Sequence, residues 1–290
     1  MGVADGYEPG ALAPFVNSLR RTGFDGDTVF FARNLPHATR AYLHAHGVTL
    51  VDFARLDLPG IRYLRKLALR MFLRTPPTEA PSARQQTLIR RLWHCQASRY
   101  LFYRDYLRAH PTRYARVLLI DLRDTYFQGA PFADPLPGDL CAFEETAALT
   151  IAEESSNHWW IERLYGAEGL RRLGPRPVLC SGATIGSAHG VRNYLERMIA
   201  LLYHHHGPRG YDQGVHNYLV WERGLPGATV CAFGQGPVMN IGTADRASFQ
   251  VGEDGTVLRT DGTACPIVHQ YDRHGDLLRH AEREFGLASV

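Results

Sequence analysis

The chain has 290 residues, of which 45% are hydrophobic and 21% are charged, and its formal net charge is +3. These values are typical of a globular protein with a substantial core, and so small a basic excess argues against a nucleic-acid-binding protein. A membrane-spanning helix needs about 20 apolar residues, and no run approaches that length, so we expect no transmembrane segment.

The five cysteines are far apart in the sequence and form no C-x-x-C pair. The amino terminus also lacks the basic and then apolar pattern of a secretory signal. Together these features predict free thiols and a cytoplasmic location.

Strands and helices alternate at the start of the chain. Strands are predicted at residues 1–7, 28–32 and 48–51, and helices at residues 9–21 and 39–46. This alternation is typical of a three-layer α/β fold.

A basic and then proline-rich stretch at residues 61–83 is predicted to form a loop or lid. One long helix is predicted to follow at residues 84–109, and Arg99 interrupts its apolar side. The apolar residues on that side are Leu88, Leu92, Cys95 and Phe102.

The most informative stretch is residues 117–132. Its apolar run 117–120 predicts a strand buried on both faces, followed at once by Asp121, Arg123 and Asp124. Ligands of open α/β sheets bind at the carboxyl ends of strands, and two carboxylates there suit Mg²⁺ or Mn²⁺. A helix cap with an Asp–Arg pair is the structural alternative.

A haloacid-dehalogenase-type phosphatase would need an acid/base aspartate at position 123. Arg123 stays protonated at neutral pH and cannot fill that role, which disfavours this function.

The rest of the chain continues the α/β pattern without an internal repeat or linker, so residues 1–290 are predicted to form one domain. Helices are predicted at residues 157–165 and 190–204 and from residue 211 onward. Strands are predicted at residues 139–145, 177–180, 230–233, 238–240, 257–259 and 267–270.

Four blocks, in this order, resemble nucleotide-diphospho-sugar transferases of the GT-A type. Residues 120–132 are similar to their Asp-x-Asp region, in a variant that reads Asp-x-Arg-Asp and continues with Phe-Gln and Pro-Phe. The other blocks are Cys-Ser-Gly-Ala-Thr-Ile-Gly at 180–186, Asp212-Gln213 with His216-Asn217, and Val-His-Gln-Tyr-Asp at 268–272. Residues 6–9 and 15–20 fit as well, so the resemblance extends over nearly the whole chain.

The resemblance implies a GT-A fold, a three-layer α/β/α arrangement with a mixed, mostly parallel central sheet. It further implies a nucleotide-binding half at residues 1–135 and an acceptor-binding half at residues 136–290. The implied activity is that of a metal-dependent, hexosyltransferase-like glycosyltransferase. Its donor would be a UDP- or GDP-sugar, and its acceptor a glycan, a secondary metabolite or a peptide side chain.

A divalent metal, Mn²⁺ or Mg²⁺, would bridge the two donor phosphates as a Lewis acid. By resemblance, Asp124 and His269 are metal ligands, while Asp121 is either a second ligand or a contact to the donor ribose. Arg123 would neutralise the diphosphate or brace the loop.

Asp5, Gly6 and Tyr7 would lie beside the base and ribose, with Tyr7 stacking on the base and Asp5 accepting a hydrogen bond. Ser181 and Gly182 would form a small-residue wall beside the donor sugar, since glycine permits close approach, or else a tight turn.

Asp212 and Gln213 are the first choice for contacts to the donor or acceptor sugar, although Asp212 also suits a helix N-cap. Glu144 and Glu145 are alternatives for a base that activates the acceptor. The side chains that would line the acceptor face, or else belong to the core, are Asn157, Trp159 and Trp160.

Two other functions are compatible with the α/β pattern. A sugar-phosphate nucleotidyltransferase usually carries a glycine-rich basic loop near its start, and residues 1–25 lack one. A non-catalytic nucleotide-sugar binding protein is disfavoured by the presence of Asp121, Asp124, Asp212 and His269.

Overall fold

A computed structural model describes residues 1–55, 82–146, 148–205 and 210–287. Almost all of the predicted loop or lid at 61–83 lies outside the described residues. Ser82 begins the next described stretch, where it caps the following helix.

The first half of the central sheet is parallel, in the order β1-β2-β3. Its strands are β1 (Gly2–Asp5), β2 (Thr28–Arg33) and β3 (Val48–Asp52), connected by α1 (Pro9–Arg21) and α2 (His37–Ala45). The α1 helix begins at a proline, whose fixed φ suits the first turn and whose missing N–H costs nothing there. The elements predicted for this region are confirmed with small shifts of their ends.

The second half of the sheet has the order β4-β7-β6-β8. The strands are β4 (Arg116–Ile120), β7 (Leu179–Ser187), β6 (Leu140–Glu144) and β8 (Ala228–Cys231). β7 runs antiparallel to both of its neighbours, whereas β6 and β8 are parallel. The Ile120 amide donates to the Met1 carbonyl (3.0 Å), which links β4 to β1. The predicted mixed, mostly parallel sheet is therefore confirmed.

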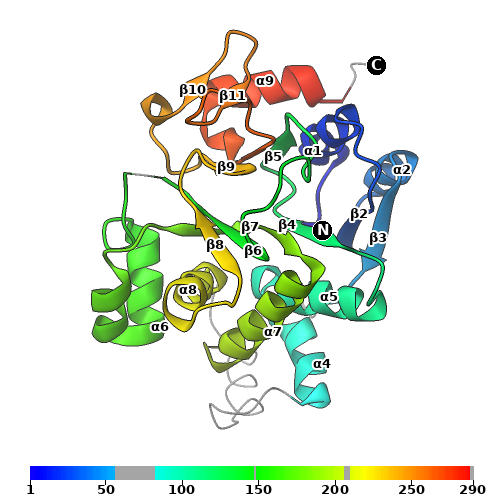
Figure 1. Ribbon diagram of the computed structural model, residues 1–290. Helices are drawn as coiled ribbons and strands as arrows, with labels where there is room; N and C mark the ends of the chain where they lie inside the picture. Colours follow the sequence, from blue (N-terminus) through cyan, green and yellow to red (C-terminus); the bar gives the residue numbers. More distant parts are fainter. Residues whose placement is uncertain (56–81, 147, 206–209, 288–290) are drawn as a thin grey trace.

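Helices cover both faces of this sheet (Figure 1). Phe31 and Leu119 face α5 (Cys95–Ala109) and α7 (Ala188–His205), whereas Phe30 and Ile120 face α1. Neighbouring strand residues point to opposite faces, so near-continuous apolar runs supply both cores. The predicted three-layer α/β/α arrangement is confirmed.

A smaller sheet with the order β5-β12-β9 carries the carboxyl-terminal part of the chain. It consists of β5 (Thr125–Phe127), β12 (Ile267–His269) and β9 (Val238–Asn240). Beside it lie the hairpin of β10 (Gln250–Val251) and β11 (Val257–Leu258), the 3-10 turns Arg246–Ser248 and Tyr271–Arg273, and α9 (Gly275–Phe285). β5, β10 and α9 were not predicted from the sequence, although Leu277, Ala281 and Phe285 of α9 recur every four residues and are buried.

The helix predicted at residues 84–109 is two helices, α4 (Ala83–Leu92) and α5. Trp93 leaves the helical conformation (ψ 156°), and the His94 side chain accepts a hydrogen bond from the Gln96 amide as the N-cap of α5. The predicted apolar side is wrong at Leu88, which is 38% exposed.

The remaining helices pack on one another and on β7. α6 (Ser155–Leu173) packs on α8 (Tyr211–Tyr218), which continues as a π-helical turn, Leu219–Arg223.

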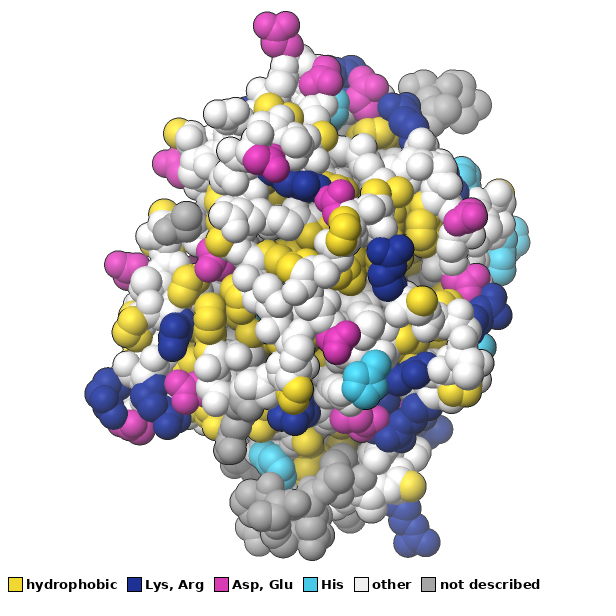
Figure 2. Space-filling view, in the orientation of Figure 1, with side chains coloured by type: hydrophobic (Ala, Val, Ile, Leu, Met, Phe, Trp, Pro, Cys, Tyr) yellow, Lys and Arg dark blue, Asp and Glu magenta, His cyan; other side chains and the backbone are white. Residues whose placement is uncertain are grey.

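On the face shown in Figure 2, basic and acidic side chains are interspersed, and neither sign covers it continuously. Within the described ranges, none of the helices is both long and apolar enough to cross a bilayer.

Candidate functional site

Gly182 lies where the side chains of Asp121 and His269, which are far apart in the sequence, come close together. A Cβ atom at this position of β7 would lie 2.6 Å from His269 Cε1 and 2.7 Å from Asp121 Oδ2. Ser181 and Gly182 lie inside a nine-residue strand, so the alternative of a tight turn at a strand end is wrong. The bare backbone of Gly182 is what lets β4 and β12 bring these side chains together.

Asp124 is the buried centre of a charge cluster. Its carboxylate lies 3.6 Å from His269 Nε2 and 3.1 Å from Arg273 Nη1. Burial opposes ionisation of Asp124, but His269, Arg273 and Arg123 outweigh burial and lower its pKa. Burial likewise opposes a positive charge on His269. The carboxylate of Asp124, and to a smaller extent that of Asp121, nevertheless raises the pKa of its imidazole.

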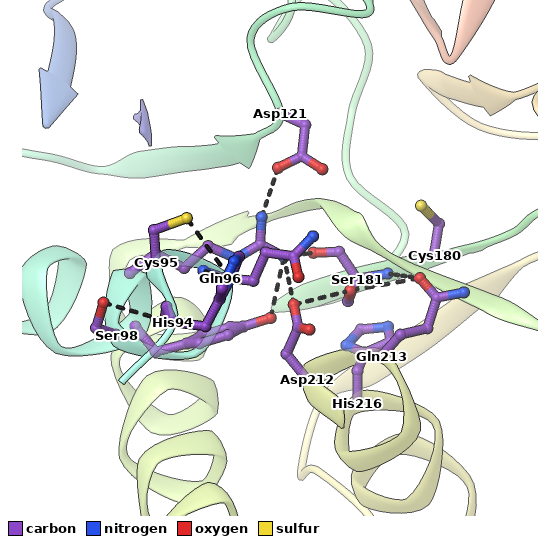
Figure 3. A network of polar contacts seen from close by, with 12 residues as sticks. His94, Cys95, Gln96, Ser98, Asp121, Cys180, Ser181, Asp212, Gln213 and His216 are labelled. Atoms are coloured by element: carbon purple, nitrogen blue, oxygen red, sulfur yellow. Dashed lines mark hydrogen bonds and ion pairs between the residues drawn. The ribbon is translucent and has the colours of Figure 1, made fainter. Parts of the chain in front are cut away.

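Arg99 joins the two parts of the site, although it was not among the site residues predicted from the sequence. Its guanidinium contacts Asp121 Oδ1 at 2.5 Å, Asp212 Oδ2 at 2.9 Å and the Ser181 carbonyl at 3.1 Å. Figure 3 shows Asp121 and Asp212 approaching this network from opposite sides. Burial disfavours the charge on Arg99, but Tyr100 and the two carboxylates outweigh it and raise the pKa. The available signal was a charged residue on the otherwise apolar side of a helix.

Asp212 lies in the first turn of α8 rather than at its N-cap, which is Gly210 in a left-handed conformation. Its carboxylate is 5% exposed and lies 3.5 Å from Ser181 Oγ, in addition to its pair with Arg99. Burial raises the pKa of Asp212, and Arg99 opposes that shift. Asp212 is thus held in place by side chains of α5 and β7.

Gln213 connects α8 to the end of β6. Its amide nitrogen donates to Glu145 Oε1 (3.1 Å) and to Asn157 Oδ1 (3.4 Å). Glu145 is 2% exposed, and burial raises its pKa despite the hydrogen bonds from Cys180 and Gln213. The structure therefore places Glu145 behind Gln213, not on an open surface.

The residues considered for the acceptor face are divided by their burial. Asn157 is buried and donates to Glu154 Oε2 (2.7 Å). Trp159 is 48% exposed, with its ring centroid 6.0 Å from that of Tyr211, the residue before Asp212. Trp160 packs against Gly210. Of the three residues, Trp159 presents an open aromatic surface beside α8.

The turn after β1 carries Asp5, Gly6 and Tyr7. Asp5 pairs with Arg33 at 2.8 Å and accepts from Asn34 Nδ2 at 3.3 Å, so its carboxylate already has partners at the end of β2 and in the residue after it. Gly6 has φ +72°, which turns the chain away from the sheet. Burial, followed by the charge of Asp121, raises the pKa of Tyr7.

Arg123 is paired with Asp272 at 2.9 Å, and Arg273 contacts both Asp124 and Asp272. The backbone amide of Gln270 also donates to the Asp124 carbonyl at 2.6 Å. The 3-10 turn after β12 is therefore attached to the Asp121–Asp124 loop by both backbone and side chains. The side chains of Arg123 and Arg273 are about half exposed, whereas the Asp124 side chain is largely buried.

The metal ligands implied by the resemblance are only partly assembled. Over the part of the chain that is described, no three His, Cys, Asp or Glu side chains form a group that could hold a metal ion. Asp121 is instead held by Arg99. His269 Nε2, however, is buried, has no hydrogen-bond partner among the described residues, and faces Asp124. A divalent cation between them would supply that partner, so the residues present fit such an ion.

Replacing Gly182 by alanine is expected to lower the free energy of unfolding by about 1–3 kcal/mol, because the added methyl group overlaps His269 and Asp121. Urea unfolding measures this change. Gly129→Ala is the control, since a Cβ there would meet Pro266 at an ordinary 3.5 Å. Equal stability of the two variants would contradict the close packing around Gly182.

Comparisons with known proteins show that the fold of this chain is similar to that of solved structures. No protein-family model and no curated protein sequence matches the chain. Among solved structures, the chain is similar to WbbM, described as a bifunctional glycosyltransferase, with a TM-score of 0.52 and 13% identity. That match covers 97% of this chain and 48% of WbbM. An active-site mutant of LgtC matches with a TM-score of 0.52 and 12% identity, covering 100% of this chain and 96% of LgtC.

The chain spans about half the length of WbbM and nearly the whole of LgtC. At this identity the likeness shows the fold. The GT-A fold expected from the four sequence blocks is confirmed.

Proposed function

We propose that this protein is a metal-dependent glycosyltransferase that transfers a sugar from a nucleotide-diphosphate sugar to a hydroxyl or other nucleophile. The observation that carries the proposal is the cluster around Gly182. There Asp124 faces a His269 nitrogen that has no hydrogen-bond partner among the described residues, and Arg99 joins Asp121 to Asp212. Its position at the carboxyl ends of the strands of a GT-A sheet, and the similarity of fold to a glycosyltransferase, support it.

Each part of the cluster has a role in this proposal. Asp124 and His269 hold Mn²⁺ or Mg²⁺, which when bound stabilises the negative charge of the leaving nucleoside diphosphate. Asp121 serves as a second carboxylate for the metal or as a ribose contact. Arg123 and Arg273 are about half exposed, and phosphate oxygens of a UDP- or GDP-sugar would accept hydrogen bonds from them.

The sugar end of the donor would lie between β7 and α8. Ser181 and Gly182 supply a wall without bulky side chains, and Asp212 and Gln213 offer polar atoms to sugar hydroxyls. Arg99 holds Asp212 in position, and Glu145 does the same for Gln213.

Asp5 and Tyr7, in the turn after β1, would contact the ribose and base. Trp159 would lie on the acceptor side, since aromatic faces pack on apolar faces of sugars.

A screen of UDP- and GDP-sugars with Mn²⁺, in the absence of an acceptor, tests the proposal. We expect slow release of nucleoside diphosphate from one donor, dependent on the metal and lost on chelation. Asp212→Asn should reduce this release, because it removes the carboxylate that faces the sugar subsite. Exposed Glu162 in α6 provides the control, Glu162→Gln.

Two further measurements separate the alternative functions, one with a nucleoside triphosphate and a sugar phosphate and one of sugar-nucleotide binding. A sugar-phosphate nucleotidyltransferase would release pyrophosphate from a nucleoside triphosphate and a sugar phosphate. A non-catalytic binding protein would bind the sugar nucleotide without releasing any product. Either result would refute the proposed transferase.

A further inference from the structure

The last residues of β9 and β12 are Asn240 and His269, which are direct partners in the register of these parallel strands. The side chains lie on the same face, both almost fully buried, with Asn240 Oδ1 2.8 Å from His269 Nδ1. Cys180 Sγ, at 3.7 Å, is the other group near Nδ1 and is a weak hydrogen-bonding partner.

The contacts on the other side of Asn240 determine which of its atoms faces the histidine. Its amide nitrogen donates to the carbonyl oxygens of Phe143 (3.4 Å) and Glu144 (3.3 Å). These carbonyls lie where the register of β6 against β7 shifts, between Ala142 and Glu144. Carbonyl oxygens only accept, so the amide nitrogen must point to them and the amide oxygen to His269.

The amide oxygen also only accepts, which requires that Nδ1 of His269 carry a proton. In the neutral ring Nε2 then has a lone pair and no proton. This nitrogen is buried without a hydrogen-bond partner among the described residues and faces the Asp124 carboxylate across 3.6 Å. Two acceptors that face each other repel, and either a proton on Nε2, as in the imidazolium ion, or a metal cation between them removes that repulsion.

We propose that Asn240 is a positioning residue that holds His269 in the Nδ1-protonated tautomer and thereby presents the Nε2 lone pair to a divalent cation shared with Asp124. The cation part of this inference rests on the proposed function, whereas the tautomer follows from the hydrogen bonds alone. Carbonyl groups that accept a hydrogen bond from the ring nitrogen away from the metal orient metal-binding histidines in this way.

Nitrogen-15 NMR of histidine-labelled, metal-free protein tests the tautomer, with the His269 signals assigned through His269→Gln. At a pH where the ring is neutral, the wild type should be protonated at Nδ1, and Asn240→Leu should shift toward Nε2 protonation. Asn240→Asp keeps an acceptor toward Nδ1 and should retain the wild-type tautomer. Its second oxygen faces the Phe143 and Glu144 carbonyls, so Asn240→Asp should nevertheless be less stable. Wild-type protonation at Nε2 would overturn the proposal.

Manganese affinity, measured by electron paramagnetic resonance on the same proteins, tests the second part. Asn240→Leu should weaken Mn²⁺ binding by about 10–100-fold, and Asn240→Asp should restore most of it. The control is Asn193→Leu, which removes an asparagine beside His189 on the exposed side of α7. Unchanged affinity in folded Asn240→Leu would overturn the positioning role. A wild type with the expected tautomer that binds no Mn²⁺ would refute the metal-dependent function and support the tautomer alone.

Discussion

Replacing Asp124 by alanine is expected to abolish the manganese-dependent stabilisation of this protein by a nucleoside diphosphate. A ligand that binds only the folded state at about 100 times its Kd adds roughly 2.7 kcal/mol of stability, or roughly 4 °C in Tm for a domain of this size. Without the Asp124 carboxylate, His269 and the two nearby arginines cannot hold a cation, so this shift should disappear. Differential scanning fluorimetry with UDP and GDP, each with and without Mn²⁺, measures it.

Asp124 also contributes to the stability of the folded chain, because it is buried against His269 and Arg273. Asp124→Asn is therefore the companion variant, since it removes the charge and keeps the shape. Asp25→Asn, at an exposed position in the loop between α1 and β2, is the control and should retain the full shift. A folded Asp124 variant that still shows the metal-dependent shift would exclude Asp124 as a ligand.

Replacing Arg99 by methionine should lower the free energy of unfolding by about 3–5 kcal/mol, since it leaves the buried Asp212 carboxylate without its partner. The effect should arise mainly from Asp212, because the Asp121 side chain is 43% exposed and stays hydrated. The double variant Arg99→Met/Asp212→Leu, which removes both charges, should recover much of the lost free energy of unfolding, because no buried charge then remains unpaired. Urea unfolding of the single and double variants measures this coupling.

Arg104 provides the matched control for Arg99, because it lies on the same helix, is also buried and pairs with Asp105 away from the site. Arg104→Met should also destabilise the protein. It should nevertheless keep the release of nucleoside diphosphate from the donor, whereas Arg99→Met should lose it. Equal activity losses in the two variants would show that Arg99 acts only through stability.

The order of the main elements could be predicted from the sequence because it depends on local patterns. The apolar run at 117–120 is buried from both sides, and α1 begins at Pro9 as its sequence indicates. The resemblance of four blocks also led to the GT-A fold and to Asp124, His269 and Asp212. Their roles in binding and catalysis stay predictions.

Two contacts depended on tertiary structure alone. Arg99 became part of the site because the predicted long helix breaks at Trp93 and His94, which sets the direction of α5 and turns the guanidinium toward Asp121 and Asp212. Asn240 meets His269 only because β9 and β12 pair in parallel, although 29 positions separate the two residues in the sequence. Periodicity reports which face of an element is buried, but pairing between distant strands and a change of helix direction arise from packing of the whole chain.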